Sequence, residues 1–295
     1  MNAIIGATAS GKSSLAFYLA TKFKLDIFSI DSLSVYRYID IASAKPSKAE
    51  LSQVKHYGID LLNPDERCNA KIFFDLLQKV AKPNILIVGG SSFYLKSIVE
   101  GLSFIPKTTA FVESYLLDAL QNKAESYKFL NKIDPIYASK INPNDKYRIQ
   151  KALEIFLLTN QTPSDFFAIN KRQKLPFKIN IFELIKPKDS LINDIVIRTD
   201  LMFKNGLIDE VRYLMDNYPN SQSLKAIGIK EIISFLNGEI SQERARELII
   251  KNTIALAKRQ TTFNKTQFSQ VQRATFDDLN TMLTDLYKRD ENGNK

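Results

Sequence analysis

Cysteine and histidine are nearly absent from this sequence of 295 residues, which has one cysteine, Cys68, and one histidine, His56. A single cysteine excludes an internal disulfide and a cysteine-based zinc cluster, and it fits a reducing compartment. A lone histidine is more often a hydrogen-bonded structural residue than a catalyst, and we expect the structural role for His56.

Long apolar runs are missing as well. None approaches the roughly 18 residues needed to span a bilayer, and no positively charged leader precedes the apolar residues 1–5. We therefore expect a soluble protein of the cytoplasm that has no membrane partner. Its hydrophobic content of 44% is ample for a packed core.

Acidic residues are fewer than basic ones, 32 against 41, which gives a formal net charge of +9. This excess indicates a polyanionic partner such as nucleic acid, although a basic protein without such a partner is the alternative. Two stretches, 166–182 and 248–276, contain no acidic residue. Their basic residues are Lys171, Arg172, Lys174 and Lys178 in the first, and Lys251, Lys258, Arg259, Lys265 and Arg273 in the second.

Phenylalanines at positions 166, 167 and 177 accompany the first basic stretch. Basic and aromatic side chains together suit a phosphate backbone with unstacked bases, as in single-stranded RNA. A solvated basic loop explains the first stretch equally well. For Lys258 and Arg259, a favourable interaction with the end of a helix dipole is an equally sufficient cause.

The most specific pattern lies at residues 6–13, which satisfy G-x-x-x-x-G-K-[ST], the phosphate-binding loop. The glycines allow successive N–H groups to point into one hollow, and the helix that follows adds the positive end of its dipole. We expect a phosphate or diphosphate there, with the lysine on its oxygens and the final serine as a Mg²⁺ ligand. The eight residues are Gly6, Ala7, Thr8, Ala9, Ser10, Gly11, Lys12 and Ser13.

The loop opens a strand-helix-strand rhythm typical of a parallel α/β fold. A second strand over 26–30 ends on Asp31, which places that carboxylate beside the phosphate loop, and residues 31–46 are expected to form a ligand-facing loop. A third strand over 85–88 leads to Gly89 and Gly90 instead of an acidic residue. The missing Mg²⁺-binding aspartate argues against a nucleotide-hydrolysing motor or switch.

The rhythm stops near Pro106, and helical patterns replace it. We predict an α/β protein with a P-loop NTPase-like parallel sheet core, an inserted helical subdomain and a helical C-terminal region. The expected divisions are 1–106 for the first part of the core, 107–187 for the insertion, 188–288 for the helical remainder and 289–295 for a frayed tail.

Motifs in the right order along nearly the whole chain make it similar to the bacterial tRNA dimethylallyltransferases, also called tRNA isopentenyltransferases. Residues 6–13 resemble that family's G-P-T-A-S-G-K-[ST], and residues 31–46 its D-S-x-x-V-Y-R and A-K-P segments. Residues 89–94 resemble G-G-T-x-x-Y, and residues 142–154 resemble H-P-N-D-x-x-R-x-x-R-A-L-E. Segments 206–211, 226–231 and 257–262 complete the set.

The resemblance implies transfer of a dimethylallyl group from dimethylallyl diphosphate to the exocyclic amine of the adenosine immediately 3′ of the anticodon. It makes Asp31 the general base, and it places Lys12, Arg198 and Mg²⁺ on Ser13 around the departing diphosphate. Thr8 matches the threonine at the reacting end of the loop. The partners it implies are dimethylallyl diphosphate and the tRNA anticodon stem-loop, bound by a monomer.

The resemblance also implies tRNA contacts at the positions that match the family's. These are Asp31, Ser32, Leu33, Ser34, Ser91, Tyr147, Arg148, Ile149, Gln150, Lys151, Lys225, Lys230, Lys258, Arg259, Gln260 and Lys265.

Several residues depart from the family pattern without removing its chemistry. Lys in place of Arg at position 151 loses a bidentate phosphate contact. The other departures are Ala7 for proline, Ser34 for glutamine, Ser91 for threonine, Tyr147 for glutamine, Phe263 for tryptophan, and Glu113 near a basic position.

Other interpretations stay open on the sequence alone. Asp31 also suits a helix cap or a ligand of Mg²⁺-bound water, and Arg198 a surface ion pair. For the whole chain, the competing functions are a small-metabolite kinase, a non-catalytic RNA-binding protein and a transferase that prenylates free AMP. The two basic stretches argue against the kinase and the AMP transferase, because a small acceptor needs no extended cationic surface.

Overall fold

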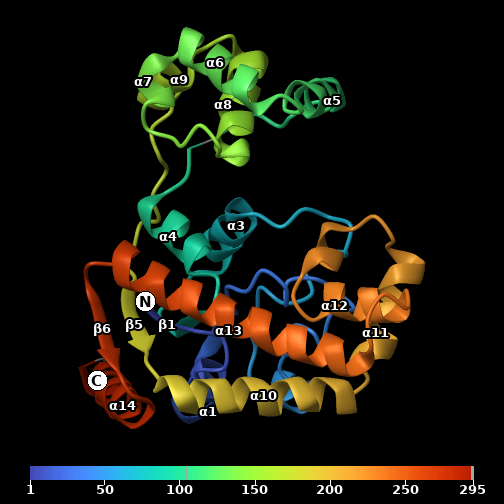
Figure 1. Ribbon diagram of the computed structural model, residues 1–295. Helices are drawn as coiled ribbons and strands as arrows, with labels where there is room; N and C mark the ends of the chain where they lie inside the picture. Colours follow the sequence, from blue (N-terminus) through green and yellow to red (C-terminus); the bar gives the residue numbers. More distant parts are fainter. Residues whose placement is uncertain (104, 294–295) are drawn as a thin grey trace. The chain divides into compact units, whose positions relative to one another are not determined.

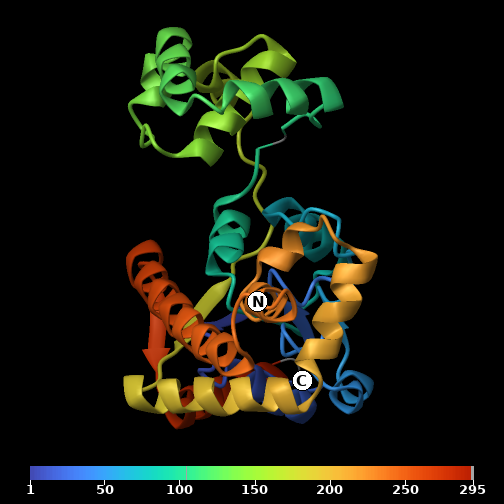
Figure 2. The same cartoon turned by 45° about the vertical axis from the view of Figure 1, so that its right-hand side comes forward.

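The computed structural model describes residues 1–103 and 105–293, and the chain divides into two compact units. The first unit consists of Met1–Val99 and Leu175–Lys295, and the second of Glu100–Lys174 (Figures 1 and 2). The boundaries of the insertion, 107 and 187 by sequence, therefore become 100 and 174. The reason is that residues 180–184 form a strand of the sheet in the first unit.

The elements of the first unit alternate between strand and helix before becoming largely helical. Its strands are β1 (Asn2–Gly6), β2 (Asp26–Ser29), β3 (His56–Tyr57), β4 (Ile85–Gly89), β5 (Asn180–Leu184) and β6 (Val271–Ala274). Its helices are α1 (Lys12–Phe23), α2 (Lys48–Gln53), α3 (Ala70–Val80), α4 (Ser92–Glu100), α10 (Lys188–Lys204), α11 (Leu207–Asn217), η1 (Gln222–Lys225), α12 (Ile229–Leu236), α13 (Gln242–Gln267) and α14 (Phe276–Gly293).

The strands form one parallel sheet of six in the order β3-β2-β4-β1-β5-β6. The continuous apolar runs of β1 and β4 are buried because helices cover both faces of the sheet. This confirms the predicted α/β fold. Since β4 lies between β1 and β2, the phosphate loop, the Gly89–Gly90 turn and Asp31 all emerge at one edge of the sheet.

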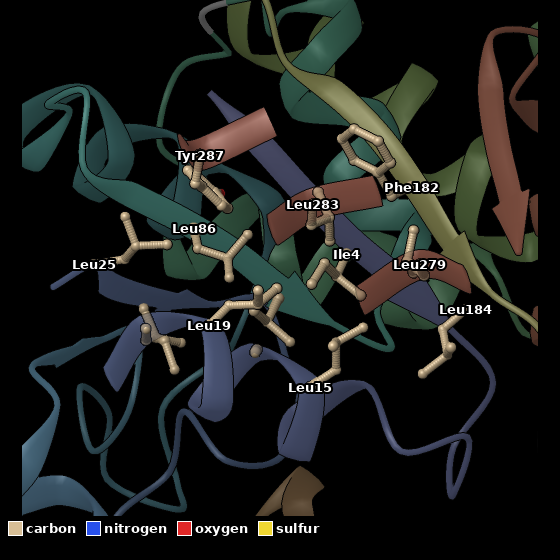
Figure 3. Close-up of a cluster of buried hydrophobic side chains, with 14 of the residues drawn as sticks. Ile4, Leu15, Leu19, Leu25, Leu86, Phe182, Leu184, Leu279, Leu283 and Tyr287 are labelled. Atoms are coloured by element: carbon tan, nitrogen blue, oxygen red, sulfur yellow. The ribbon is translucent and has the colours of Figure 1, made fainter. Parts of the chain in front are cut away.

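The core under the phosphate loop joins the two ends of the described chain. Leu15 and Leu19 of α1 pack with Leu279 and Leu283 of α14 against Ile4 of β1 (Figure 3). Each of these five residues is fully buried, with 0% of its surface exposed. The helix that follows the phosphate-binding loop is therefore held by apolar contacts from the far end of the sequence, at roughly 1.5–3 kcal/mol for each fully buried side chain.

Two C-terminal elements differ from the sequence prediction. Residues 271–274 form the edge strand β6, so the segment 188–288 is not purely helical. The helix α14 continues to Gly293, whereas a frayed tail was expected from residue 289; residues 294–295 of that tail lie outside the described residues. Within the described ranges, no helix has the length and apolar character to cross a bilayer.

The second unit is a helical cluster with a core of its own. Its helices are α5 (Ala110–Ala119), α6 (Lys123–Ile133), α7 (Pro135–Ala138), α8 (Lys146–Thr159) and α9 (Pro163–Ile169). Leu116, Leu130 and Ile149 are buried together at its centre. The buried carboxylate of Asp134 caps α7 and accepts hydrogen bonds from the N–H and hydroxyl of Ser164, which joins α9 to this core.

Candidate active site

A cavity of about 910 Å³ opens at the carboxyl edge of the sheet, entirely within the first unit. Its lining includes Lys12 of the phosphate loop, Asp31 after β2, Gly90 after β4 and Arg198 of α10. This volume is at the upper end of the range for small-molecule sites, so it accommodates a diphosphate ester together with a nucleoside.

The phosphate loop has the backbone geometry that its sequence predicts. Gly11 precedes α1 with φ of +96°, a conformation that favours glycine. The first N–H groups of α1 have no partner within the helix, and no side chain caps them. They provide the donors that an anionic oxygen requires.

A second close approach explains the glycine that ends β4. A Cβ on Gly89 would lie 1.9 Å from the carbonyl oxygen of Ile30, a separation too short for any side chain at this position. This approach lets the N–H of Ser91 donate to the same carbonyl at 3.3 Å. It brings the residues after β4 against the chain just before Asp31.

Lys12 lies at the centre of the site, where its Nζ donates to the carbonyl oxygen of Ala7 at 3.1 Å. Burial lowers the pKa of Lys12 to about 8; nearby Asp31 opposes this shift, and Arg198 adds to it. The ammonium is therefore held in a site that does not fully compensate its charge. A bound anion would stabilise its protonated form.

Thr8 is fixed from two sides. Its hydroxyl accepts a hydrogen bond from Nη1 of Arg198 at 3.1 Å, and its N–H donates to Oε1 of Gln260 at 2.8 Å. The other end of the Gln260 amide, Nε2, donates to the carbonyl oxygen of Gly90 at 2.9 Å. The side chain of Gln260 thus links the phosphate loop, α13 and the turn after β4.

Arg198 is directed into the cavity and is not a surface ion pair. Burial lowers the pKa of its guanidinium, and the charge of Asp31 opposes that shift. A second cation beside Lys12 suits a ligand that carries more than one negative charge.

Asp31 presents one carboxylate oxygen to the site. Its Oδ1 accepts the N–H groups of Leu33 and Ser34 at 2.8 and 3.0 Å, which fixes the side chain in an Asx-type turn. Within the described residues, Oδ2 accepts no hydrogen bond. Asp31 therefore caps a turn with one oxygen and has a second oxygen available to accept a proton.

Residues that could hold Mg²⁺ are few. The described chain contains no group of three or more His, Cys, Asp and Glu side chains that could hold a metal ion. Ser13 lines the cavity beside Lys12, and its hydroxyl has no hydrogen-bond partner among the described residues. One protein hydroxyl completed by phosphate oxygens and water is a donor set that Mg²⁺ accepts, so these residues fit the ion.

Residues 34–267 match the family model described as IPP transferase. The chain belongs to the IPP transferase family. This confirms the family that its motifs indicated.

Curated relatives of this IPP transferase cover almost the whole chain. The tRNA dimethylallyltransferase of Nautilia profundicola is 47% identical over 287 residues, which are 96% of this chain and 98% of the relative. That of Wolinella succinogenes is 45% identical, covering 92% of this chain and 93% of the relative.

Solved structures agree with this assignment. The tRNA isopentenylpyrophosphate transferase of Staphylococcus epidermidis is 28% identical and superposes with a TM-score of 0.65, covering 100% of this chain and 99% of the other. A eukaryotic dimethylallyltransferase acting on tRNA is 25% identical with a TM-score of 0.79, covering 93% of this chain and 74% of the other.

The structure brings some of the RNA-contact residues predicted in the first unit to the cavity. Ser32, Leu33, Ser91, Lys225 and Arg259 line it, and the N–H of Ser32 donates to Oγ of Ser91 at 3.0 Å. Outside the cavity lining, Lys258 and Lys265 are exposed on α13, and Lys230 is exposed beside Glu231.

Two further predicted contacts in the first unit, Ser34 and Gln260, line the cavity and also have hydrogen-bond partners within the protein. Ser34 is buried, with its hydroxyl 3.4 Å from that of Ser29. Gln260 uses both ends of its amide in holding Thr8 and Gly90. Arg273, one of the basic residues of the stretch 248–276, pairs with the buried carboxylate of Glu183 at 2.8 Å.

In the second unit, the predicted contacts lie at the start of α8. Tyr147 is exposed and Gln150 partly exposed, Arg148 pairs with Asp145, and Lys151 pairs with Glu154. The prediction that Ile149 contacts tRNA is corrected, because its side chain is fully buried in the core of this unit and cannot reach RNA. Of the basic and aromatic stretch near residue 170, Phe166 is buried and Arg172 pairs with Glu100.

Two residues that position the loop 31–46 were not assigned a role from sequence. Glu210, in the first turn of α11, accepts the N–H groups of Asp40, Ile41 and Ala42 at 2.7, 2.7 and 2.9 Å. The second residue is Lys45. Glu210 and Lys45 both lie within the family motifs of segments 206–211 and 31–46, and those motifs were the sequence feature that could have indicated their role.

Lys45 secures the same loop from the other side. Its nearly buried ammonium contacts Asp40 and Asp60, each at 2.6 Å, and donates to the carbonyl oxygen of Tyr36 at 2.6 Å. The loop that carries the cavity wall is therefore fixed by charged hydrogen bonds from both Glu210 and Lys45.

Proposed function

We propose that this IPP transferase moves a dimethylallyl group from dimethylallyl diphosphate to N6 of the adenosine immediately 3′ of the anticodon in tRNAs that read codons starting with U. The N6 lone pair forms a bond to C1 of the dimethylallyl group while the C1–O bond breaks. The diphosphate leaves with that electron pair, and a proton leaves N6. The products are N6-dimethylallyladenosine and diphosphate.

The observation that carries the proposal is the meeting of a phosphate loop and one available carboxylate oxygen in a single cavity. Asp31 Oδ2 accepts the proton from N6, while the hydrogen bonds on Oδ1 hold the carboxylate in place. β4 ends at Gly89 and is followed by Gly90. The end of this strand therefore lacks the carboxylate that hydrolytic P-loop enzymes use there.

The groups around the phosphate loop receive the departing diphosphate. The N–H groups at the start of α1, the ammonium of Lys12 and the guanidinium of Arg198 supply positive charge where negative charge grows. Ser13 would hold Mg²⁺, which when bound neutralises part of the diphosphate charge.

The RNA substrate explains the exposed cations on α13, Lys258, Arg259 and Lys265. The adenosine has to leave its stack to reach a cavity at the sheet edge, and the cavity is large enough to receive it. A tRNA substrate and the lack of a spanning helix in the described chain support a cytoplasmic site of action. As part of the proposal, one copy of the chain is sufficient, since all the reacting groups lie in one unit.

The test incubates the protein with Mg²⁺, radiolabelled dimethylallyl diphosphate and unmodified tRNA, with AMP and ATP controls. Label in tRNA that requires Mg²⁺ and is lost in Lys12→Ala supports the proposal. Label in AMP alone identifies a mononucleotide acceptor, and ATP consumption without label transfer identifies a kinase. Either result overturns the acceptor proposed here.

A further inference from the structure

Three tyrosines form an exposed cluster beside the cavity in the first unit. Tyr38 follows the Tyr36 turn, Tyr213 belongs to α11, and Tyr218 follows the end of α11. The ring of Tyr38 lies 5.4 Å from that of Tyr213 and 6.0 Å from that of Tyr218, and the last two rings are 6.5 Å apart. These three residues are called the tyrosine cluster below.

The tyrosine cluster has aromatic surface open to solvent. Tyr38 is 46% exposed and Tyr213 is 42% exposed, which is high for rings that contact each other. None of the three hydroxyl groups forms a hydrogen bond with another residue in the described ranges. Mutual packing therefore leaves both ring surface and hydroxyl groups available to a partner.

The backbone of Tyr38 indicates that packing alone does not explain this residue. Its φ is +64°, a left-handed conformation that is uncommon for a bulky residue and costs of order one kilocalorie per mole relative to glycine. A glycine would remove this strain but also the ring that packs against Tyr213 and Tyr218. We infer that the interactions of the Tyr38 ring compensate the free-energy cost of this backbone conformation.

Segments that flank the tyrosine cluster in the sequence line the cavity. Tyr36 and Ala42, on either side of Tyr38, line the cavity, and Gln222 lines it four residues after Tyr218. Arg37 lies beside the rings, with its guanidinium held by the carbonyl oxygen of Asp60 and by Oδ1 of Asn63, each at 3.1 Å. Exposed aromatic surface and a fixed cation therefore flank segments that line the cavity.

We propose that the tyrosine cluster is a stacking platform for an unpaired nucleobase of the RNA, a nucleotide other than the acceptor adenosine. This inference rests on the proposed function, because it needs an RNA substrate whose bases are splayed out of their stack. Aromatic rings receive such a base whatever its identity, since every base has a π-face. The cluster thus contributes to RNA affinity without touching the reacting atoms.

The decisive variant is Tyr38→Gly, which removes the ring and adopts the positive φ without steric strain. We expect the KM for the tRNA anticodon stem-loop to rise at least about 5-fold, while kcat and the KM for dimethylallyl diphosphate stay within about 2-fold. Tyr38→Phe keeps the ring and should behave as wild type. Tyr18→Leu, at another tyrosine that is 45% exposed on α1, is the matched control and should change neither constant.

A second measurement identifies the stacked base. Stem-loops carrying 2-aminopurine at one loop position at a time are bound to wild type and to Tyr38→Gly, and the quenching of their fluorescence by aromatic stacking is compared. Quenching lost in Tyr38→Gly at a position other than the acceptor supports the inference. The inference is overturned if wild type and Tyr38→Gly quench the fluorescence equally at every loop position, or if the KM of Tyr38→Gly for the stem-loop is unchanged.

The two proposals fail in different ways. If wild type labels the stem-loop and Tyr38→Gly does so with the same KM, only the stacking platform is wrong. If wild type neither binds nor labels any RNA, the proposed function fails, and the platform fails with it. A thermal unfolding curve of Tyr38→Gly excludes an affinity loss caused by unfolding, and Tyr213→Leu provides an independent removal of ring surface.

Discussion

Single atoms of Asp31 have separate tasks in this site. Oδ1 fixes the turn that contains Leu33 and Ser34, and Oδ2 is available to take a proton. Asparagine keeps an oxygen that can accept the same two N–H groups but has no basic atom. The residue therefore allows the structural and the chemical role to be tested separately.

For Asp31→Asn we expect transfer to tRNA to fall roughly 10²- to 10⁴-fold, the usual contribution of a general base, with folding and tRNA binding retained. Single-turnover transfer and a filter-binding assay measure the two quantities. A near-wild-type rate would remove Asp31 from the mechanism and leave it only the role of capping the turn.

The charge of Lys12 makes stability depend on pH. Because its pKa in the folded protein, about 8, is below that of the unfolded chain, the folded state is penalised at pH values below 8. The penalty disappears as the pH rises from about 8 towards 10.5, where both states lose the proton. We expect Lys12→Met to abolish transfer yet to raise the free energy of unfolding at pH 7 by about 1–2 kcal/mol.

Urea unfolding at pH 7 and at pH 10 checks this prediction, and the difference between variant and wild type should shrink at the higher pH. Lys22→Met, on the exposed face of α1, is the control and should show no such trend. Equal stability of Lys12→Met and wild type at pH 7 would mean that Asp31 compensates the charge fully.

The amide of Gln260 supplies one donor and one acceptor in a fixed direction, to Gly90 and Thr8. Glutamate keeps the acceptor for the N–H of Thr8 but cannot donate to the carbonyl oxygen of Gly90. We expect Gln260→Glu and Gln260→Ala each to lower kcat about 10- to 100-fold with less than a threefold change in the KM for tRNA, because the residue positions Thr8.

Steady-state kinetics with tRNA as the varied substrate distinguishes the two roles considered for Gln260. A direct RNA contact predicts the reverse pattern, with a raised KM and an unchanged kcat. Arg259→Gln, the adjacent exposed position on α13, serves as the comparison for an RNA contact.

Local pattern and motif predicted which residues gather at the site better than which helical side chains face the solvent. The phosphate loop, Asp31 and Arg198 follow from local pattern or motif, and the structure brings them together. Ile149 and Gln260 could not be placed in this way. Whether a side chain in a helix faces the core or the solvent depends on neighbours that come from distant parts of the chain.

At the scale of elements, α11 supports the loop 31–46 through the side chain of Glu210. The carboxylate of Glu210 accepts three consecutive N–H groups, from Asp40 to Ala42. Burial raises the pKa of Glu210, and these backbone hydrogen bonds oppose the shift. Removing the carboxylate leaves partly buried donors without a partner.

We expect Glu210→Ala to lower the free energy of unfolding by about 2–4 kcal/mol, with Glu210→Gln milder, since each lost charged hydrogen bond costs roughly 1–3 kcal/mol. Chemical denaturation monitored by circular dichroism measures this loss. Glu247→Gln, an exposed acid on α13, should change stability by less than about 0.5 kcal/mol. Equal effects of the two substitutions would contradict a supporting role for Glu210.

The strands also differ in how readily the sequence predicts them. The buried apolar residues of β1, β2 and β4 made these strands predictable close to their observed bounds. β6, Val271–Ala274, is a short edge strand with two adjacent polar residues, Gln272 and Arg273, and it follows a long helix, so its sequence resembles a loop. Its pairing with β5, and the salt bridge from Arg273 to Glu183, depend on the folded sheet.

At the scale of the whole molecule, the positive charge predicts how RNA binding responds to salt. Each phosphate contact contributes about 0.7 to the slope of log K against log salt for a single strand. We expect Lys258→Ala combined with Lys265→Ala to reduce that slope by about 1–1.5 and to weaken binding of different tRNAs equally. Lys71→Ala, an exposed lysine on α3, should leave the slope unchanged.

Binding isotherms at several salt concentrations measure the slope. An unchanged slope in the double variant would show that the exposed face of α13 does not contact RNA, and the positive charge would then have no role in recognition there.

The union of α1 and α14 over the sheet sets an order of events during synthesis. Leu15 and Leu19 emerge from the ribosome early, whereas Leu279 and Leu283, which cover them, emerge more than 250 residues later. At roughly 5–20 residues per second, the nascent phosphate-binding region leaves apolar surface uncovered for on the order of ten seconds or more. Chaperone engagement during translation is therefore expected to be heaviest on the first 30 residues and to end only when α14 docks.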